Sequence, residues 1–259
     1  MRRTPVVLAV AAAAAGLLVA ACGSTVSGTA TVAGSVPASS SATGPSSGGE
    51  AGSAPSGSSS GGSSGGDLTE LLLGSGDFPA GYRVAPVDTS TLAKLAQGIE
   101  GLIPGLTVTP PECARTNPYS DLSSAAGVTG SSAAGALVVV EIIGPADAGS
   151  LGLLRATLGR CAVFRATFTG PDGKPLALEA TSSPQQAPPV DADDTLGLLN
   201  TSTADVGTGS PLRTSQSQLY AQVGGTLVGV ALSSVTAAPL DQAVVDAIFT
   251  AAVAKVRAG

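Results

Sequence analysis

The chain has 259 residues, of which 43% are hydrophobic, 12% charged and 3% aromatic, and its net charge is −6. Such an acidic chain, which has no tryptophan, lacks the basic surface and the stacking aromatics of nucleic-acid-binding proteins, so we exclude nucleic acid as a partner. The absence of histidine removes the Ser-His-Asp triad, the Cys-His pair and most zinc sites. We therefore expect no metal, no cofactor and no catalysis of these kinds.

The first 22 residues have the parts of a bacterial export signal. The basic pair Arg2-Arg3 precedes an apolar run of 16 residues that ends at Ala21. A helix that spans a bilayer needs about 20 residues, so an uncleaved anchor helix is the weaker interpretation. The segment Val19-Ala20-Ala21-Cys22 resembles the bacterial lipobox. This resemblance implies that residues 1–21 are removed and that Cys22 carries diacylglycerol and often an amide-linked acyl chain such as palmitate.

A lipidated Cys22 predicts a location on the extracytoplasmic face of the cell membrane. Each buried acyl methylene contributes about 0.8 kcal/mol, so two or three chains hold a protein on a bilayer without a spanning helix. Residues 22–66 then form a tether rich in Ser and Gly, in which Glu50 is the only charge. This composition is typical of a flexible linker, because it buries too little apolar surface to order the chain. Residues 67–259 remain as a single globular domain.

The first half of this domain shows short elements separated by prolines. Pro86 indicates an edge strand, because proline donates no ladder hydrogen bond. Pro104 ends a helix whose N-cap we assign to Thr89 or Ser90. In chain order we expect a helix at 67–73, a strand at 83–87, a helix at 92–103, an extended segment at 106–109 and a turn at 110–113.

The second half alternates in the manner of strands and ends in an amphipathic helix. Two glycines, Gly224-Gly225, between alternating runs are a strong hairpin signal. In chain order we expect a buried central strand at 136–143, a helix from Pro145 to Gly159, a hairpin of 163–169 with 176–181 around a turn at 170–173, a strand at 194–206, a hairpin of 219–223 with 226–232, and a helix from Pro239. This order predicts an α+β domain with one curved, mainly antiparallel sheet and helices packed on one face.

Three cysteines are present, and the lipobox accounts for Cys22. In an exported protein the remaining pair, Cys113 and Cys161, predicts a structural disulfide. A redox pair or a metal site is the alternative, although the chain has neither a C-x-x-C spacing nor a histidine.

Two short motifs carry a resemblance to a known family. Asp-Phe-Pro-Ala-Gly-Tyr at 77–82 and Thr-Pro-Pro-Glu-Cys at 109–113, behind a lipobox and a Ser/Gly linker, resemble actinobacterial (mycobacterial-type) cell-envelope lipoproteins. The C-terminal domain of those proteins has no assigned function. More remotely, the element order and the Pro-Pro-Glu-Cys turn are similar to the extracellular sensor domains of PknH-type receptor kinases, which typically hold two disulfides. The resemblance covers residues 67–257 and carries over no catalytic residues.

Two charged clusters are candidate binding sites. Arg155, Arg160 and Arg165 surround Cys161 and form the densest basic group, which would suit an anion such as a phosphate or carboxylate. The alternative is that these three are solvated charges on a helix end and a strand face. The aspartates within 191–194 lack the glycine and terminal glutamate of an EF-hand, so we interpret them as a polar turn rather than a calcium site.

The sequence favours a membrane-anchored extracytoplasmic lipoprotein whose non-catalytic, sensor-like domain binds an envelope ligand or protein partner. One alternative is a lipid carrier with an apolar cavity between the sheet and the C-terminal helix. A second is a histidine-free hydrolase, which would need two carboxylates that face one another in a cleft.

Overall fold

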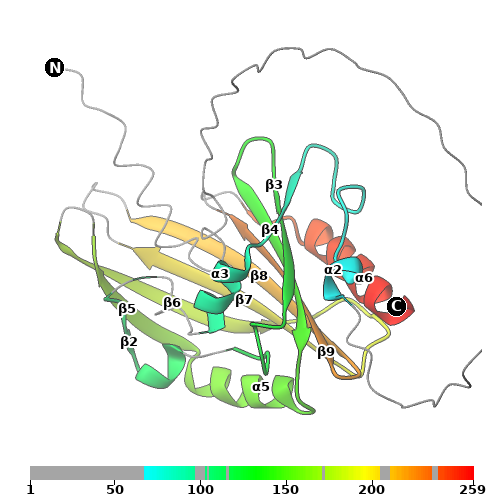
Figure 1. The fold of residues 1–259 in the computed structure, drawn as a ribbon. Helices are drawn as coiled ribbons and strands as arrows, with labels where there is room; N and C mark the ends of the chain where they lie inside the picture. Colours follow the sequence, from blue (N-terminus) through cyan, green and yellow to red (C-terminus); the bar gives the residue numbers. More distant parts are fainter. Residues whose placement is uncertain are drawn as a thin grey trace, which may run out of the picture. The chain divides into compact units, whose positions relative to one another are not determined.

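The computed structural model describes residues 67–96, 103, 105–114, 117–170, 173–204, 211–234 and 239–259. Within these ranges nine strands form one sheet in the order β1-β3-β4-β9-β8-β7-β6-β5-β2, and each strand pairs antiparallel with its neighbours (Figure 1). The strands are β1 (Arg83–Pro86), β2 (Thr107–Thr109), β3 (Ala126–Ser131), β4 (Leu137–Pro145), β5 (Val163–Thr169), β6 (Pro175–Gln185), β7 (Asp194–Ala204), β8 (Leu212–Val223) and β9 (Thr226–Ser234).

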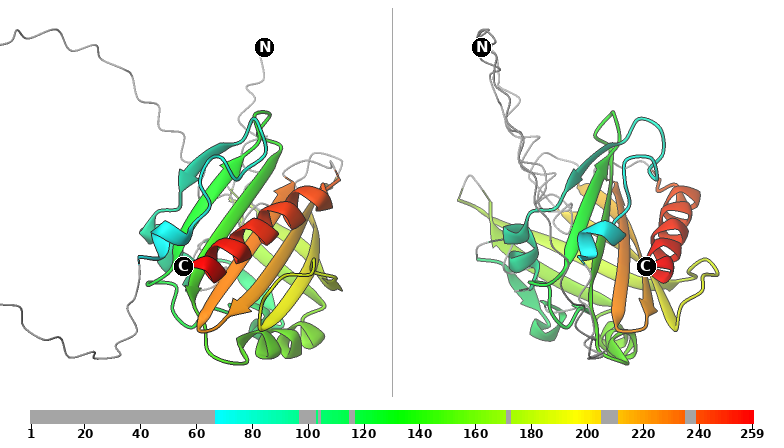
Figure 2. Two further views of the ribbon diagram at one scale, coloured as in Figure 1. Left: turned by 90° about the vertical axis from the view of Figure 1, so that its right-hand side faces the viewer. Right: turned by 45° about the vertical axis from the view of Figure 1, so that its right-hand side comes forward.

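Helices cover both faces of this sheet. The α-helices are α2 (Leu68–Leu71), α3 (Thr89–Ala96), α5 (Ser150–Arg160) and α6 (Gln242–Ala258), and η2 (Pro111–Ala114) is a 3-10 helix. Figure 2 shows α6 lying across β8 and β9 on one face, with α5 on the other. The predicted α+β class and the antiparallel sheet are confirmed. The helices do not share one face as expected, because β4 and β9 present buried apolar side chains in both directions.

Helix α6 forms the larger core with the sheet. Val245, Ile248 and Phe249 are at most 1% exposed, and they pack with buried residues of β8 and β9 such as Leu219 and Val230. Asp241 caps the helix by accepting a hydrogen bond from the backbone N–H of Ala243 at 3.1 Å. Lys and Arg in the last turn complement the helix dipole. The α6 interface with the sheet is therefore filled by side chains.

The opposite face carries two smaller clusters. Val87 and Leu92, from the segment around α3, pack on Val140 of β4. Leu151 and Leu154 of α5 belong to a second cluster with Leu196 and Leu198 of β7 and Leu227 of β9. Because side chains alternate along a strand, Val140 and Leu227 point away from α6 while their neighbours point toward it. These clusters hold α3 and α5 on the face that α6 leaves uncovered.

A buried carboxyl group holds the first described segment of the chain on the α6 face. Glu141 of β4 is 0% exposed, and its Oε2 accepts a hydrogen bond from the backbone N–H of Leu73 at 2.9 Å. The ammonium group of Lys255 on α6 donates to the carbonyl oxygen of Leu72. The peptide group between Leu72 and Leu73 is therefore hydrogen-bonded at both its polar atoms: its carbonyl oxygen accepts from an ammonium group and its N–H donates to a carboxyl group. We call this arrangement the peptide clamp.

Burial dominates the acid–base behaviour of the peptide clamp. Loss of hydration raises the pKa of Glu141 to about 7, against the lowering effects of the Leu73 N–H and the Lys255 charge, and Asp77 adds a smaller raising effect. The other carboxylate oxygen, Oε1, is buried without a hydrogen-bond partner among the described residues.

Two helix starts differ from the predicted ones. Asp88, rather than Thr89 or Ser90, caps α3, since its side chain accepts from the backbone N–H of Thr91 at 2.9 Å. Pro145 does not open α5 but closes β4, and the helix begins five residues later at Ser150. The predicted end of α3 at Pro104 and the tip of the turn at 170–173 lie outside the described residues.

The sequence prediction missed strand β3 and made several others too short, β8 most of all. Strand β3 was not predicted, because its sequence Ala-Gly-Val-Thr-Gly-Ser contains a single large apolar residue. Its Gly130 makes room for the ring of Phe78, whose atoms would lie 2.6 Å from an added Cβ. Strand β8 begins at Leu212, whereas the sequence predicted Leu219. The prediction missed its first half because that half is polar on both faces and so shows no apolar alternation.

Candidate functional site

A cavity of about 170 Å³ lies on the sheet face opposite α6, partly open to solvent. Its floor is formed by β5, β6, β7 and β8, and its side by α5, η2 and the residues that precede β2. Strand register explains why these side chains meet. Phe164 of β5 pairs with Ala180 of β6, Ala180 with Ser202 of β7, and Ser202 with Thr214 of β8, so all four point to the same face.

One side of the cavity is apolar. Phe164 and Phe168 alternate along β5 and are half-buried, and Leu178 of β6 lies beside them. Leu154 and Leu158, one turn apart on α5, contribute the adjacent wall. These side chains present aromatic and aliphatic surface to a bound molecule.

The other side of the cavity is a row of amides and hydroxyls, which we call the amide row: Asn200, Ser202, Thr214, Gln216, Gln218 and Tyr220. Gln218 Nε2 donates to Gln216 Oε1 at 2.7 Å, and Gln216 Nε2 donates to Ser233 Oγ at 2.9 Å. Asn200 Oδ1 accepts from Ser182 Oγ at 2.5 Å. These bonds fix the planes of the three amide groups before any ligand arrives.

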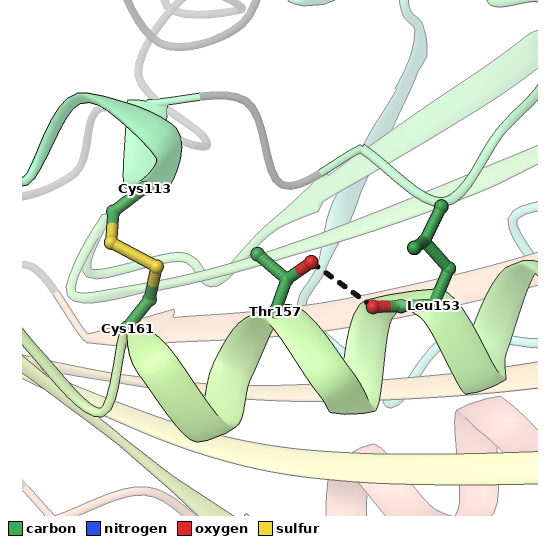
Figure 3. The surroundings of a disulfide bond; sticks show 4 residues. All are labelled: Cys113, Leu153, Thr157 and Cys161. Carbon is green, nitrogen blue, oxygen red and sulfur yellow. Dashed lines mark hydrogen bonds between the residues drawn. A yellow bond between two sulfur atoms is a disulfide. The ribbon is translucent and has the colours of Figure 1, made fainter.

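The Cys113–Cys161 disulfide is present and borders the cavity. It joins η2 to the residue that follows α5, so it holds the wall of the cavity in place, as Figure 3 shows. Both cysteines are 2% exposed. Farther along α5, the hydroxyl of Thr157 donates to the carbonyl oxygen of Leu153 within the helix.

The lining of the cavity carries no formal charge among the residues that the structure describes. Among its described lining residues none is Asp, Glu, Lys or Arg. Burial raises the pKa of Tyr220 to about 12, so this phenol stays protonated at neutral pH. The site can therefore form hydrogen bonds and apolar contacts but cannot neutralise an ion.

The three predicted anion-binding arginines are not brought to one point. Arg155 of α5 forms a bidentate pair with Asp194, with N–O distances of 2.8 and 2.7 Å, and this contact lowers the pKa of Asp194. Arg165 lies on the face of β5 away from the cavity and pairs with Glu179 at 3.0 Å. Arg160 is exposed at the end of α5. Two of the three guanidinium groups thus already have a carboxylate partner.

The aspartates within 191–194 also point to separate partners. Asp191 pairs with Arg257 of α6 at 3.0 Å, Asp193 accepts from the backbone N–H of Gly224 at 2.6 Å, and Asp194 pairs with Arg155. In the described ranges no group of three or more His, Cys, Asp or Glu side chains is placed to hold a metal ion.

The lipidation residue Cys22 lies outside the described residues, so its modification stays a prediction. In the part of the chain that the structure describes, no helix combines the length and the apolar character that crossing a bilayer requires.

The sequence analysis missed the amide row, although a signal was present. Gln216, Gln218 and Tyr220 recur at every second position, which places them on one face of a strand. The low aromatic content of 3% gave no such signal. Of the seven Phe and Tyr residues in the chain, three line this cavity: Phe164, Phe168 and Tyr220.

Comparisons with known proteins agree with the resemblance inferred from the two motifs. The extracellular domain of PknH from Mycobacterium tuberculosis is similar at 13% identity with a TM-score of 0.46, over 73% of this chain and 94% of that one. An uncharacterised protein of Mycobacterium smegmatis, the Rv0999 ortholog, is similar at 14% identity with a TM-score of 0.47, over 74% of this chain and 97% of that one. No curated protein sequence matches. Residues 67–257 match the family described as Domain of unknown function (DUF5642), and the chain therefore belongs to that family.

Proposed function

We propose that this protein is a lipid-anchored, extracytoplasmic lipoprotein whose domain binds a ligand, without catalysis, in the cavity between β5–β8 and α5. The lipobox that ends at Cys22 supports the anchor and the location. The cavity carries the binding proposal, because an apolar wall beside a few fixed polar groups is the usual composition of a ligand site.

The composition of the cavity supports a binding role rather than a reaction. Its hydroxyl groups, such as those of Ser202 and Thr214, lie next to amides and to one another, and the described lining contains no carboxylate to act as a general base. The chain contains no histidine. A histidine-free hydrolase would need two facing carboxylates, and none belongs to the described lining.

The lipid-carrier alternative needs an apolar cavity between the sheet and the C-terminal helix, and that space is filled. Val245, Ile248 and Phe249 of α6 are at most 1% exposed and fill the interface with the sheet, and the cavity lies on the other face. A hydrocarbon chain would also leave the remaining donors and acceptors of Gln216 and Gln218 unmet, and unmet buried hydrogen bonds are costly.

Native mass spectrometry of the full protein, purified from its host, tests the proposal. The wild type should carry an adduct that is released on denaturation. Ser202→Leu fills the cavity and should lose this adduct. Thr203→Leu is the matched control, since Thr203 is the next residue on β7 and is exposed on the opposite face.

Crosslinking in the native envelope would capture a ligand that dissociates during purification. A wild type that carries no adduct, and that crosslinks to the same molecules as Ser202→Leu, would contradict ligand binding in the cavity.

A further inference from the structure

The cavity has three properties that together restrict the chemistry of its ligand: the absence of charge from its described lining, the amide row and the aromatic wall. The inference that follows rests on the proposed function, because it takes for granted that the cavity binds a ligand.

The absence of charge excludes ionic groups from the bound part of the ligand. A carboxylate, phosphate or ammonium that enters a partly desolvated site loses hydration, and it needs an opposite charge or several charge-directed hydrogen bonds to compensate. None of the described lining residues supplies an opposite charge. Of the three arginines around Cys161, Arg155 and Arg165 are already paired with Asp194 and Glu179, and Arg160 is exposed at the end of α5.

The amide row requires a ligand that both donates and accepts hydrogen bonds. A glutamine side chain has two N–H donors and an oxygen that accepts twice. Gln216 is 8% exposed, and it uses one donor toward Ser233 and one acceptor position toward Gln218. The row therefore offers both donors and acceptors, and hydroxyl or acetamido groups can meet both kinds. A hydrocarbon chain can meet neither.

The aromatic wall requires apolar surface on the other side of the same ligand. Phe164 and Phe168 are half-buried and leave part of their rings toward the cavity. The face of an aromatic ring is negative, so it attracts the weakly positive C–H groups on the flat side of a sugar ring. The size is also suitable, since engineered protein cavities of about 150 Å³ take up a benzene molecule and this cavity measures about 170 Å³.

From these properties we infer that the cavity binds an uncharged sugar residue, with its hydroxyl or acetamido groups along the amide row and its C–H face on Phe164 and Phe168. The sugar is one ring of a free saccharide, of a wall glycan or of a glycolipid headgroup, since all three present the same chemistry to the cavity.

Saturation-transfer NMR on the full protein tests this inference. The protein is purified from its host in a detergent without a sugar headgroup. The probes are methyl glycosides of glucose, mannose, galactose, arabinose and N-acetylglucosamine, with glucuronate and glucosamine as charged counterparts and octanol as an apolar one. At least one neutral glycoside should receive saturation, strongest on its ring C–H protons, and the charged counterparts and octanol should receive none.

Two variants locate the binding. Gln218→Leu removes hydrogen bonding from the amide row and should weaken the glycoside at least tenfold. Gln185→Leu is the matched control, because Gln185 of β6 bonds Ser217 on the opposite face, and it should bind the glycoside as the wild type does. Thermal unfolding and circular dichroism confirm that each variant is folded.

The outcomes separate the ligand class from the proposed function. Binding of octanol or of a charged sugar in place of the neutral glycosides, sensitive to Gln218→Leu, would overturn the sugar class and leave ligand binding intact. If no probe receives saturation, the sugar class is also overturned. If native mass spectrometry and crosslinking then show no ligand that depends on the cavity, the proposed binding function is overturned as well. If a neutral glycoside binds, vesicles that carry its glycolipid and a soluble oligosaccharide of the same sugar then identify the source.

Discussion

Replacement of Glu141 by Gln should remove most of the pH dependence of stability between pH 5 and pH 8.5. Burial raises the pKa of Glu141 from 4.5 to about 7, which corresponds to about 3 kcal/mol between the two protonation states. The folded state holds this proton more tightly than the unfolded state does. The contribution of Glu141 to the free energy of unfolding is therefore largest below pH 4.5, falls by about 3 kcal/mol as the pH rises to 7, and stays lower above it.

The composition of the chain makes this window easy to interpret. The chain has no histidine, the residue that normally titrates there. Asp88, whose pKa is lowered to about 2 by hydrogen bonds from Ser90 and Thr91, titrates well below the window. A neutral glutamine at 141 keeps an oxygen that can accept from the Leu73 N–H, so the variant should fold and its free energy of unfolding should be flat across the window.

Urea denaturation of the oxidised protein at several pH values measures the effect. Glu179→Gln is the matched control, because Glu179 is a strand carboxylate with 54% of its side chain exposed, and it should change the slope little. A wild type whose stability is constant or rises from pH 5 to 8.5, or a Glu141→Gln variant with the wild-type slope, would refute the reasoning.

Three further predictions concern the anchor, the disulfide and the core. Cys22→Ala should move the protein from the membrane fraction to the soluble fraction, and wild-type protein starting at Met1 without fatty acid would contradict lipidation. Cys161→Ala opens a loop that spans 48 residues and should lower the free energy of unfolding by about 4 kcal/mol in denaturant titration, whereas a loss under about 1 kcal/mol would count against loop entropy. Phe249→Ala should cost 3–5 kcal/mol, roughly, while Leu153→Ala, at a side chain that is 71% exposed, should cost little by the same assay.

Local patterns predicted most of the elements of this fold. The apolar residues of α6 recur at helical spacing, and two of them, Ile248 and Phe249, are indeed buried against the sheet. Gly224-Gly225 forms the β8–β9 turn, and the two cysteines left beside Cys22 form the disulfide. These features depend on short spacings or on a count, which a single sequence shows directly.

The cavity was not predicted, because it depends on register between distant strands. Phe164 and Gln216 share a face only through three successive pairings, from β5 to β8, and one shifted residue in any of them would reverse the result. The placement of α5 and α6 on opposite faces of the sheet could likewise not be predicted, because it depends on how the helices pack against the assembled sheet. Pro145 illustrates the same limit, because proline suits a first helical turn and an end of a strand equally well.

The peptide clamp has a mechanical consequence if the domain is anchored through the proposed tether. The chain that precedes Asp67 leads into α2, which packs on the α6 face, while the cavity occupies the other face. With the proposed tether, tension from the amino-terminal side would be resisted first by the packing of Leu68 and Leu71 of α2 and then by the bonds from Lys255 and Glu141 to the Leu72–Leu73 peptide group. A pull that detaches α2 would therefore act on the α6 face before it acts on β5 to β8, which form the floor of the cavity on the opposite face.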